Sequence, residues 1–258
     1  MKSKGKITGI LFFTALLLSV LYISLFSDTE AGNKVLSIEL TGNNHLSIEN
    51  YIKFAKLDKI SDYKYLSLPV IKDRLEKHPY ISKADVKFSS KDVVTVNVHE
   101  KIFQAVILSN GENYLITENF DVLPLLPFTK NIELPLIANP KLSAKLKLFN
   151  KWNDNEIITA FKIIDAAKLT NLDMFAGLSE IDMRDGKEIV ISMTDLECPV
   201  VFGRGSEVQK IVYFDSIWSR LQNNKSALSN LNYVDLRFDK LIYLGMNESE
   251  PVEQENQG

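Results

Sequence analysis

Cysteine is almost absent from this sequence, since Cys198 is the only one among 258 residues. A single cysteine excludes a disulfide within the chain and a metal site built from several thiolates. Histidine is also rare, and His45, His78 and His99 fall in three separate predicted elements, without the HExxH spacing of a zinc enzyme. The sequence therefore predicts no metal site, and we expect no cofactor.

A strong charge of one sign is lacking as well. The 30 lysines and arginines nearly balance the 33 aspartates and glutamates, which gives a formal net charge of −3. This balance gives no reason to expect nucleic acid as a partner. The GxSxG motif of a catalytic serine is also missing. We therefore predict no catalytic residue, no small-molecule substrate and no enzymatic activity.

Two short patterns invite a catalytic interpretation, and the first is a pair of glycines. Gly203 and Gly205 lie between a predicted strand and a predicted helix, as in nucleotide-binding loops. Val208 stands where such a loop needs its third glycine. We interpret the two glycines as a tight turn, with Ser206 as the N-cap of the following helix.

The second pattern is a pair of acids. Glu180 and Asp182 lie two residues apart on a predicted strand, so they point the same way about 6.5 to 7 Å apart. Glycosidases use carboxylates at such a spacing. No neighbouring residue predicts that one acid is desolvated while the other stays charged, which is the condition for dividing acid and base roles. We expect both acids to face solvent.

The one long apolar run covers residues 7–26, which are twenty residues without a charged side chain. As a helix this run is roughly 30 Å long, which matches the hydrocarbon core of a bilayer. Its apolar side chains surround the helix, unlike those of a core helix with one apolar stripe. Thr29 and Ala31 offer a weak signal-cleavage site, but the run exceeds the roughly 7 to 15 apolar residues of a cleavable signal. We predict a transmembrane helix.

The charges around this run predict its topology. Lysines precede the run and acids follow it, at Lys2, Lys4, Lys6, Asp28 and Glu30. An excess of lysine marks the cytoplasmic side of a membrane helix. We therefore expect residues 1–6 to form a cytoplasmic stub, residues 27–34 to form a linker, and the rest of the chain to lie outside the cytoplasm.

Residues 35–101 show the periodicities of a small domain. Alternating and helical apolar patterns predict, in order, a strand at 35–41, helices at 47–56 and 67–78, and strands at 81–88 and 94–98. Ser47 is a suitable N-cap for the first helix, and Pro69 lies in the first turn of the second, whose apolar residues are Val70, Ile71 and Leu75. This order requires one three-stranded sheet with both helices on one face.

Residues 102–245 are predicted to form a mostly antiparallel β domain with two flanking helices, which makes the whole chain α+β. Its expected strands are 102–108, 113–116, 122–123, 178–184, 188–193, 200–202, 232–238 and 240–244, and its helices are 154–169 and 207–222. The second helix is predicted to turn inward Val208, Ile211, Phe214, Trp218 and Leu221. Asp185 and Gly186 form a hairpin signal, because both positions of that turn need positive φ. Residues 246–258 contain four glutamates and predict a disordered acidic tail.

Segments from both halves of the chain resemble one known family. VLSIELTGNNHLSIENYI (35–52) and ISKADVKFSSKDVVTVNVHEK (81–101) resemble a POTRA domain. VVFG (200–203), a helix containing Lys210, and YVDLRF (233–238) resemble the FtsQ/DivIB family of bacterial cell-division proteins. A POTRA domain directly after a single membrane helix is also similar to that family.

The resemblance implies a non-catalytic scaffold of the divisome, in the cell inner membrane at the division septum, with its bulk in the periplasm. The implied partners are FtsB (DivIC in other lineages), FtsL and other divisome proteins, with a segment of FtsB bound by the C-terminal region. The last predicted strand adds an independent argument, because a sheet edge exposes unpaired N–H and C=O groups. The candidate partner-binding residues are Tyr233, Asp235, Arg237, Phe238, Lys240, Ile242 and Tyr243.

The alternative function is that of a POTRA-containing outer-membrane assembly or secretion factor, because POTRA domains carry few distinguishing motifs. Two local departures from the FtsQ/DivIB pattern indicate a distant branch of that family. Residues 100–103 lack the proline that usually ends the POTRA domain, and residues 117–120 lack the glycine of a following turn. An anchored enzyme without a visible motif is the third interpretation.

Overall fold

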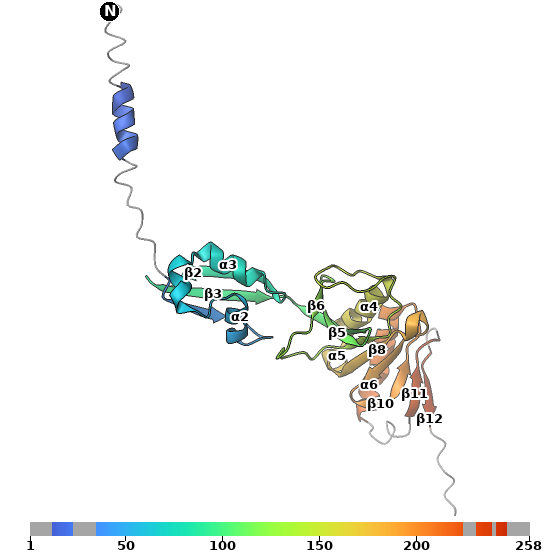
Figure 1. The fold of residues 1–258 in the computed structure, drawn as a ribbon. Helices are drawn as coiled ribbons and strands as arrows, with labels where there is room; N and C mark the ends of the chain where they lie inside the picture. Colours follow the sequence, from blue (N-terminus) through green and yellow to red (C-terminus); the bar gives the residue numbers. More distant parts are fainter. Residues whose placement is uncertain (1–11, 23–34, 224–230, 239–240, 247–258) are drawn as a thin grey trace, which may run out of the picture.

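The computed structural model describes residues 12–22, 35–223, 231–238 and 241–246 (Figure 1). After an N-terminal helix, the described chain forms two units, each built on one β-sheet. We call these the small sheet and the large sheet. The predicted cytoplasmic stub, the predicted linker and residues 247–258 of the predicted tail lie outside the described residues.

Residues 12–22 form a helix whose side chains are all exposed. They cover the middle of the predicted membrane segment, whose two ends, 7–11 and 23–26, lie outside the described residues. Among the helices that the structure describes, none combines the length and the apolar character needed to cross a bilayer.

The small sheet has three strands and is accompanied by two α-helices. Its elements are β1 (Ser37–Thr41), α2 (Ile48–Phe54), the 3-10 helix η1 (Ile60–Tyr65), α3 (Leu68–Glu76), β2 (Ile81–Phe88) and β3 (Val93–Glu100). The strand order is β1-β3-β2, with β1 parallel and β2 antiparallel to β3. The predicted order of strands and helices is confirmed, and η1 is an additional turn between the two helices.

Capping and apolar spacing explain the two helices of the small sheet. The Ser47 hydroxyl accepts a hydrogen bond from the N–H of Asn50 and begins α2, as predicted. In α3, Ile71 and Leu75 lie four residues apart and are fully buried. Val70, which the pattern places with them, is 37% exposed. Its position is rotated by about 100° from that of the next residue, which turns it away from the sheet.

Within the residues that the structure describes, the large sheet has nine strands. They are β4 (Phe103–Ser109), β5 (Glu112–Thr117), β6 (Val122–Pro124), β7 (Leu136–Ala138), β8 (Leu178–Asp182), β9 (Val190–Met193), β10 (Leu196–Val201), β11 (Leu231–Asp235) and β12 (Tyr243–Met246). The order is β12-β11-β10-β9-β8-β7-β4-β5-β6. Five neighbouring pairs are antiparallel and three are parallel, so the predicted mostly antiparallel sheet is confirmed.

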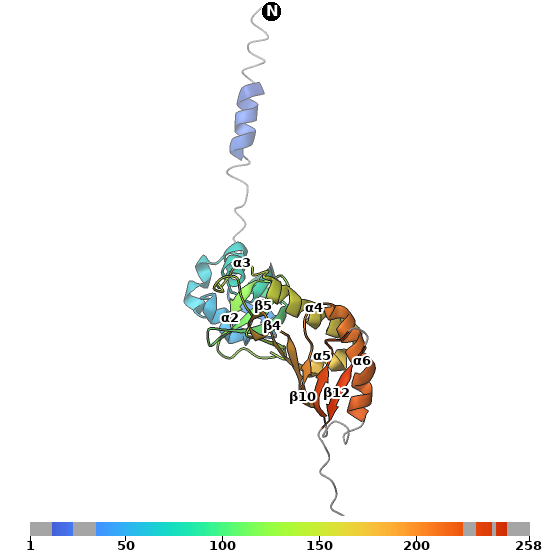
Figure 2. The ribbon, with the colours of Figure 1, turned by 90° about the vertical axis from the view of Figure 1, so that its right-hand side faces the viewer.

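Three α-helices accompany the large sheet, one more than the sequence predicts. They are α4 (Asn155–Thr170), α5 (Leu172–Gly177) and α6 (Glu207–Asn223). One cross-strand row shows which face they cover, because Ile181, Ile191, Val200 and Val234 are neighbours in register and at most 1% exposed. The helices pack over this row in one buried cluster (Figure 2). The other face of β11 and β12 therefore points away from them.

Helix α6 buries Ile211, Phe214 and Trp218, as predicted. The pattern also predicts Val208 on this stripe, but Val208 is 55% exposed. At about 100° per residue, the middle of the buried stripe lies roughly 90° around the helix from Val208. Val208 and Val212 therefore share the exposed side of α6.

The two sheets are joined through Tyr80 and a loop that follows β6. The Tyr80 hydroxyl donates to the carbonyl of Pro124 (2.9 Å) and accepts from the N–H of Leu126 (2.8 Å). In the same loop, the N–H of Lys130 donates to the carbonyl of His45 at 2.8 Å. Side chains of the large sheet complete the buried cluster of the small sheet, namely Phe103, Leu115 and Leu123. We call these contacts the joint, and β12 lies at the opposite end of the large sheet (Figure 1).

Candidate partner-binding edge

Strand β12 is an edge strand, because it pairs with β11 on one side and has no neighbour on the other within the described sheet. Its outer side therefore offers backbone N–H and C=O groups to a further strand. The sequence predicts this strand over 240–244, and it lies over Tyr243–Met246. Leu241 lies before the strand, and its N–H donates to the carbonyl of Phe238 at 3.4 Å instead of to a neighbouring strand.

The shift changes the interpretation of three residues. Met246, which the sequence places in the tail, belongs to the sheet, so that boundary is wrong by one residue. Ile242 is half-buried and packs against the core of the large sheet, which limits its access to a partner. Lys240 lies outside the described residues.

Three aromatic side chains lie beside the edge, and we call them the aromatic strip: Tyr233, Phe238 and Tyr243. Their exposed fractions are 43%, 50% and 48%. The rings of Phe238 and Tyr243 meet edge to face, with centroids 4.7 Å apart. Tyr233 pairs with Gly245 across β11 and β12, and a Cβ atom on Gly245 would lie 2.7 Å from Cζ of the tyrosine ring. The glycine therefore leaves room for the Tyr233 ring over the edge strand.

Asp235 and Arg237 form a close pair at the end of β11. The Asp235 carboxylate accepts from the backbone N–H of Arg237 (3.0 Å), from its Nε (3.0 Å) and from its Nη2 (2.7 Å). These hydrogen bonds lower the pKa of Asp235 below its ordinary value. Only 5% of the Asp235 side chain is exposed, against 48% for Arg237. Asp235 therefore acts on a partner only through the arginine that it orients.

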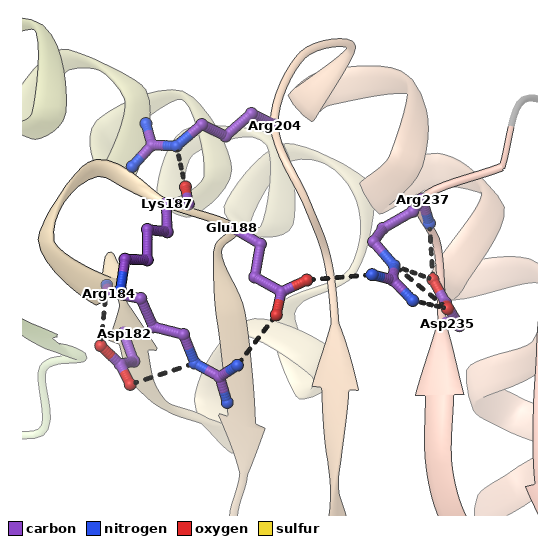
Figure 3. Close-up of polar contacts among 7 residues, drawn as sticks. All are labelled: Asp182, Arg184, Lys187, Glu188, Arg204, Asp235 and Arg237. Atoms are coloured by element: carbon purple, nitrogen blue, oxygen red, sulfur yellow. Dashed lines mark hydrogen bonds and ion pairs between the residues drawn. The ribbon is translucent and has the colours of Figure 1, made fainter.

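The guanidinium of Arg237 also belongs to a chain of alternating charges across the sheet (Figure 3). Nη1 of Arg237 donates to Oε2 of Glu188 at 3.1 Å, and Nη1 of Arg184 donates to Oε1 of the same glutamate at 3.0 Å. Nε of Arg184 lies 3.7 Å from Oδ2 of Asp182. We call Asp182, Arg184, Glu188, Arg237 and Asp235 the charge chain. It links the β8–β9 hairpin to the end of β11.

The acid pair on β8 only partly matches its predicted environment. Glu180 and Asp182 are both half-buried, so the expectation that they face solvent is met only in part. Burial, together with the charge of Asp182, raises the pKa of Glu180. Asp182 already accepts hydrogen bonds from the side-chain amide of Asn139 (2.9 Å) and from the N–H of Arg184 (3.0 Å). Its carboxylate is thus bound within the protein, which gives it a structural role.

The glycine pair forms a tight turn, as predicted, and the turn supports Arg237. Gly203 has a φ of 66°, and a Cβ atom there would lie 2.7 Å from Cγ of Arg237. The glycine therefore gives the arginine stem room to pass. Ser206 occupies the N-cap position of α6, as predicted, because its carbonyl accepts from the N–H of Lys210 at 2.9 Å, but its φ of 55° differs from the extended backbone usual there. Nζ of Lys210 donates to the carbonyls of Phe202 (2.9 Å) and Arg204 (3.2 Å), which closes the turn.

A groove of about 330 Å³ runs between this turn and the edge. It is lined by Arg204, Gly205, Ser206, Gln209, Lys210, Tyr213, Arg237 and Phe238. Burial lowers the pKa of Lys210. The groove therefore places basic groups and an exposed aromatic ring next to the open side of the sheet.

Arg204 holds the turn to the β8–β9 hairpin. Its Nη1 and Nη2 donate to the two carboxylate oxygens of Glu156, both at 2.9 Å. Nη2 also donates to the carbonyl of Met183 at 3.2 Å, and Nε donates to the carbonyl of Lys187. These bonds fix the hairpin that carries Arg184 and Glu188 in the charge chain.

Sequence reasoning missed Glu188 and Gly245 as parts of this site. Asp185 and Gly186 have the predicted positive φ, 53° and 84°, but they lie in a longer loop than predicted, because the last β8–β9 pair joins Asp182 to Val190. No sequence signal connected this hairpin to β11, because Glu188 and Arg237 are 49 positions apart in the chain. A glycine in a predicted strand next to aromatic residues was the available signal for Gly245.

Comparisons with known proteins match both units. Residues 33–101 match the family described as POTRA domain, FtsQ-type, and residues 105–237 match the family described as Cell division protein FtsQ/DivIB, C-terminal. The second match ends at Arg237, so it contains Tyr233 and Asp235, and Phe238 and Tyr243 follow it.

Individual relatives are distant. A cell division protein FtsQ from Syntrophotalea carbinolica is 22% identical over 84% of this chain and 75% of its own length. A cell division protein DivIB from Clostridium acetobutylicum is 31% identical over 53% of this chain and 58% of its own length. A cell division protein FtsQ from a Geobacter species is 24% identical over 80% and 74%, respectively.

Proposed function

This chain belongs to the FtsQ/DivIB family of cell-division proteins, and from that premise we propose that it is a non-catalytic scaffold of the divisome. In this role it binds the small division protein FtsB (DivIC) together with FtsL, and brings other divisome proteins to the division septum. The FtsQ-type POTRA match supports this function over that of an outer-membrane assembly factor.

The observation that carries the proposal is the open edge of β12 beside the aromatic strip. A partner segment in extended conformation adds to such an edge, taking affinity from backbone hydrogen bonds and specificity from alternate side chains. Phe238 and Tyr243 are half-exposed and already in contact, so they offer a rigid apolar anchor. Arg237 supplies a charged group next to them for an acidic residue of the partner.

We further propose that residues 7–26 anchor the chain in the cytoplasmic membrane, with the amino terminus in the cytoplasm. Support comes from the uninterrupted apolar run and from the lysines that precede it. Residues 35–246 then lie outside the cytoplasm. With this topology the protein connects the two sides of the membrane at the division site.

A binding measurement with matched alanine variants tests the proposed interface. Phe238→Ala should weaken binding of the full chain to the homologous FtsB and FtsL pair roughly 30-fold, which corresponds to about 2 kcal/mol for a central aromatic contact. The matched control is Phe149→Ala, because Phe149 is also an exposed phenylalanine (62%) and its N–H donates to the carbonyl of Val122 in β6, at the other end of the sheet from β12. Wild-type affinity in both Phe238→Ala and Tyr243→Ala would place the interface elsewhere on the protein.

A further inference from the structure

The guanidinium of Arg237 is held on two sides by carboxylates of very different exposure (Figure 3). Nε and Nη2 face Asp235, whose side chain is 5% exposed. Nη1 faces Glu188, whose side chain is 35% exposed. The Asp235 side is closed within the protein, whereas the Glu188 side is open to solvent on the side of the arginine that faces the start of β9.

We propose that Glu188 is a built-in competitor for the partner: in the free protein it occupies the position on Nη1 of Arg237 that an acidic side chain of the partner takes in the complex. This inference rests on the proposed function, because it concerns the same edge and the same arginine. It adds a residue that sets how tightly, and how selectively, an acidic partner binds.

Glu188 keeps a second ion-pair partner when it is displaced from Arg237. Its other carboxylate oxygen, Oε1, already accepts from Nη1 of Arg184 at 3.0 Å. Arg184 is itself 44% exposed, and its Nε lies 3.7 Å from Asp182, longer than a hydrogen bond. Glu188 can therefore leave Arg237 and remain paired. The exchange replaces one carboxylate by another on Arg237 without leaving a charge uncompensated.

Arg237 does not need Glu188 to keep its orientation. Three hydrogen bonds to Asp235 already fix its backbone N–H, Nε and Nη2. An ion pair between two exposed groups contributes little stability, since it is screened by water and salt. The Glu188 contact is thus weak enough to exchange, and the Asp235 contact is strong enough to present the arginine.

The competitor also provides selectivity. A partner with an acidic side chain opposite Arg237 breaks the ion pair between Glu188 and Arg237 and replaces it with its own. It therefore loses no ion pair when Glu188 moves away. A partner without that acid meets Glu188 as an unwanted negative charge beside Arg237 and gains nothing from the arginine. Specificity of this kind depends on the repulsive element as much as on the attractive one.

The test uses Glu188→Gln in the full chain, with the homologous FtsB and FtsL pair as the probe. Removing the competing charge should lower the dissociation constant about 2- to 5-fold at low salt, the range expected for one exposed ion pair, and the gain should shrink at high salt. Glu197→Gln is the matched control, because Glu197 is an exposed acid on β10, four residues before the strand's end near Arg237. It should leave the dissociation constant unchanged.

A second variant and a measurement of the melting temperature distinguish a competitor from a residue that only stabilises the orientation of Arg237, which we call a brace. Glu188→Asp keeps the charge but shortens the reach to Arg237, so it should give part of the gain in affinity. If Glu188→Gln instead weakened binding, or lowered the melting temperature and the affinity together, Glu188 would be a brace and the inference would be overturned. A dissociation constant equal to that of wild type and of the Glu197→Gln control would overturn it too.

Failure of the proposed function would look different. In that case the wild-type chain would not bind the FtsB and FtsL pair, or Phe238→Ala would have no effect on binding. Amide substitutions of the partner's acids complete the design. The amide substitution of the partner acid that binds Arg237 should cost more affinity when it is measured against Glu188→Gln than against wild type. In Glu188→Gln the competing carboxylate is already absent, so the partner's acid contributes its full ion pair.

Discussion

The buried carboxylate of Asp235 holds the exposed guanidinium of Arg237 through Nε at 3.0 Å and Nη2 at 2.7 Å. The two residues are separated by one position in the chain, so this short segment alone exposes a fixed positive charge at the end of β11. The hydrogen bonds that orient the arginine also keep the aspartate ionised.

Asp235→Asn should therefore destabilise the protein and loosen Arg237. The variant replaces a buried acceptor of charged hydrogen bonds by an amide, which should cost about 1 to 3 kcal/mol of unfolding free energy. Urea denaturation measures this cost. Asp195→Asn is the control, because Asp195 is exposed and accepts from Gln222 at 3.3 Å. Equal stability of the two variants would contradict the assigned role of Asp235.

The same pair gives a pH dependence of known sign. Because the pKa of Asp235 is lowered in the folded protein, its contribution to stability is present above its ordinary value of 3.8. The contribution is lost as the pH falls through the lowered pKa. The stability difference between wild type and Asp235→Asn should thus be constant at neutral pH and shrink below pH 3.8.

Gly245→Ala should displace the Tyr233 ring from the edge strand. The added Cβ would lie 2.7 Å from Cζ of Tyr233, so the ring must move, at a cost on the order of 1 kcal/mol. Binding of FtsB and FtsL should weaken as well, because Tyr233 belongs to the aromatic strip. Urea denaturation and binding assays measure the two effects.

The second change Tyr233→Ala should remove most of the stability cost of Gly245→Ala, because no ring remains to be displaced. Gly177→Ala is the control: a Cβ at Gly177 would meet its nearest neighbours at 3.5 Å, an ordinary contact distance. Strict additivity of Gly245→Ala and Tyr233→Ala would show that the glycine has another role.

Local patterns were sufficient to predict most of the fold. Ser47 with its helix, the valines of β3 and the positive φ of Asp185 and Gly186 depend on neighbours within a few residues, and all three are confirmed. Val208 was wrongly predicted to be buried. It lies on the flank of the apolar stripe of α6, where burial depends on whether another element packs against that flank. Helix α5 has only six residues, too short for a clear period.

The candidate site was less predictable, since its contacts join distant parts of the chain. The half-exposed aromatic residues could be identified from the last strands and the family resemblance. The burial of Asp235 and its pairing with Arg237 require the three-dimensional structure, and so does the link from Arg237 to Glu188. Sequence spacing carries no information about a contact between two separate hairpins.

His78 should make stability fall in mildly acidic solution. It is 3% exposed, and its ring packs edge to face against the rings of Tyr51 and Phe54, with centroids 4.6 Å and 4.5 Å away. Burial lowers the pKa of His78 from 6.5 to about 4. Between pH 6.5 and about pH 4, His78 binds a proton in the unfolded chain but not in the folded protein. The free energy of unfolding should therefore fall by on the order of 3 kcal/mol as the pH drops through this window.

Urea denaturation of His78→Asn from pH 7 to pH 4 checks this assignment, because asparagine keeps an acceptor for the N–H of Tyr80 but does not titrate. The variant should lose most of the pH dependence in this window. His99→Asn is the control, because the His99 side chain is exposed. An unchanged slope in His78→Asn would assign the acid sensitivity to other groups.

Topology is tested by thiol labelling in intact cells, in a Cys198→Ser background that removes the single native cysteine. A cysteine at Ser3 should resist an impermeant thiol reagent, because it lies on the cytoplasmic side of the proposed anchor. A cysteine at Asn33 should react. The reverse pattern of labelling would mean that the chain is inserted the other way round.

The joint has a consequence for the order in which the protein is made. The small sheet is complete at Glu100, but Leu115 and Leu123 fill part of its core, so a nascent chain must lengthen beyond its last strand before that core closes. Strand β12 is made last of the described strands, about 10 s later at usual rates of synthesis. Under the proposed function a partner docks on β12, and so it meets only chains whose other described strands have already left the ribosome.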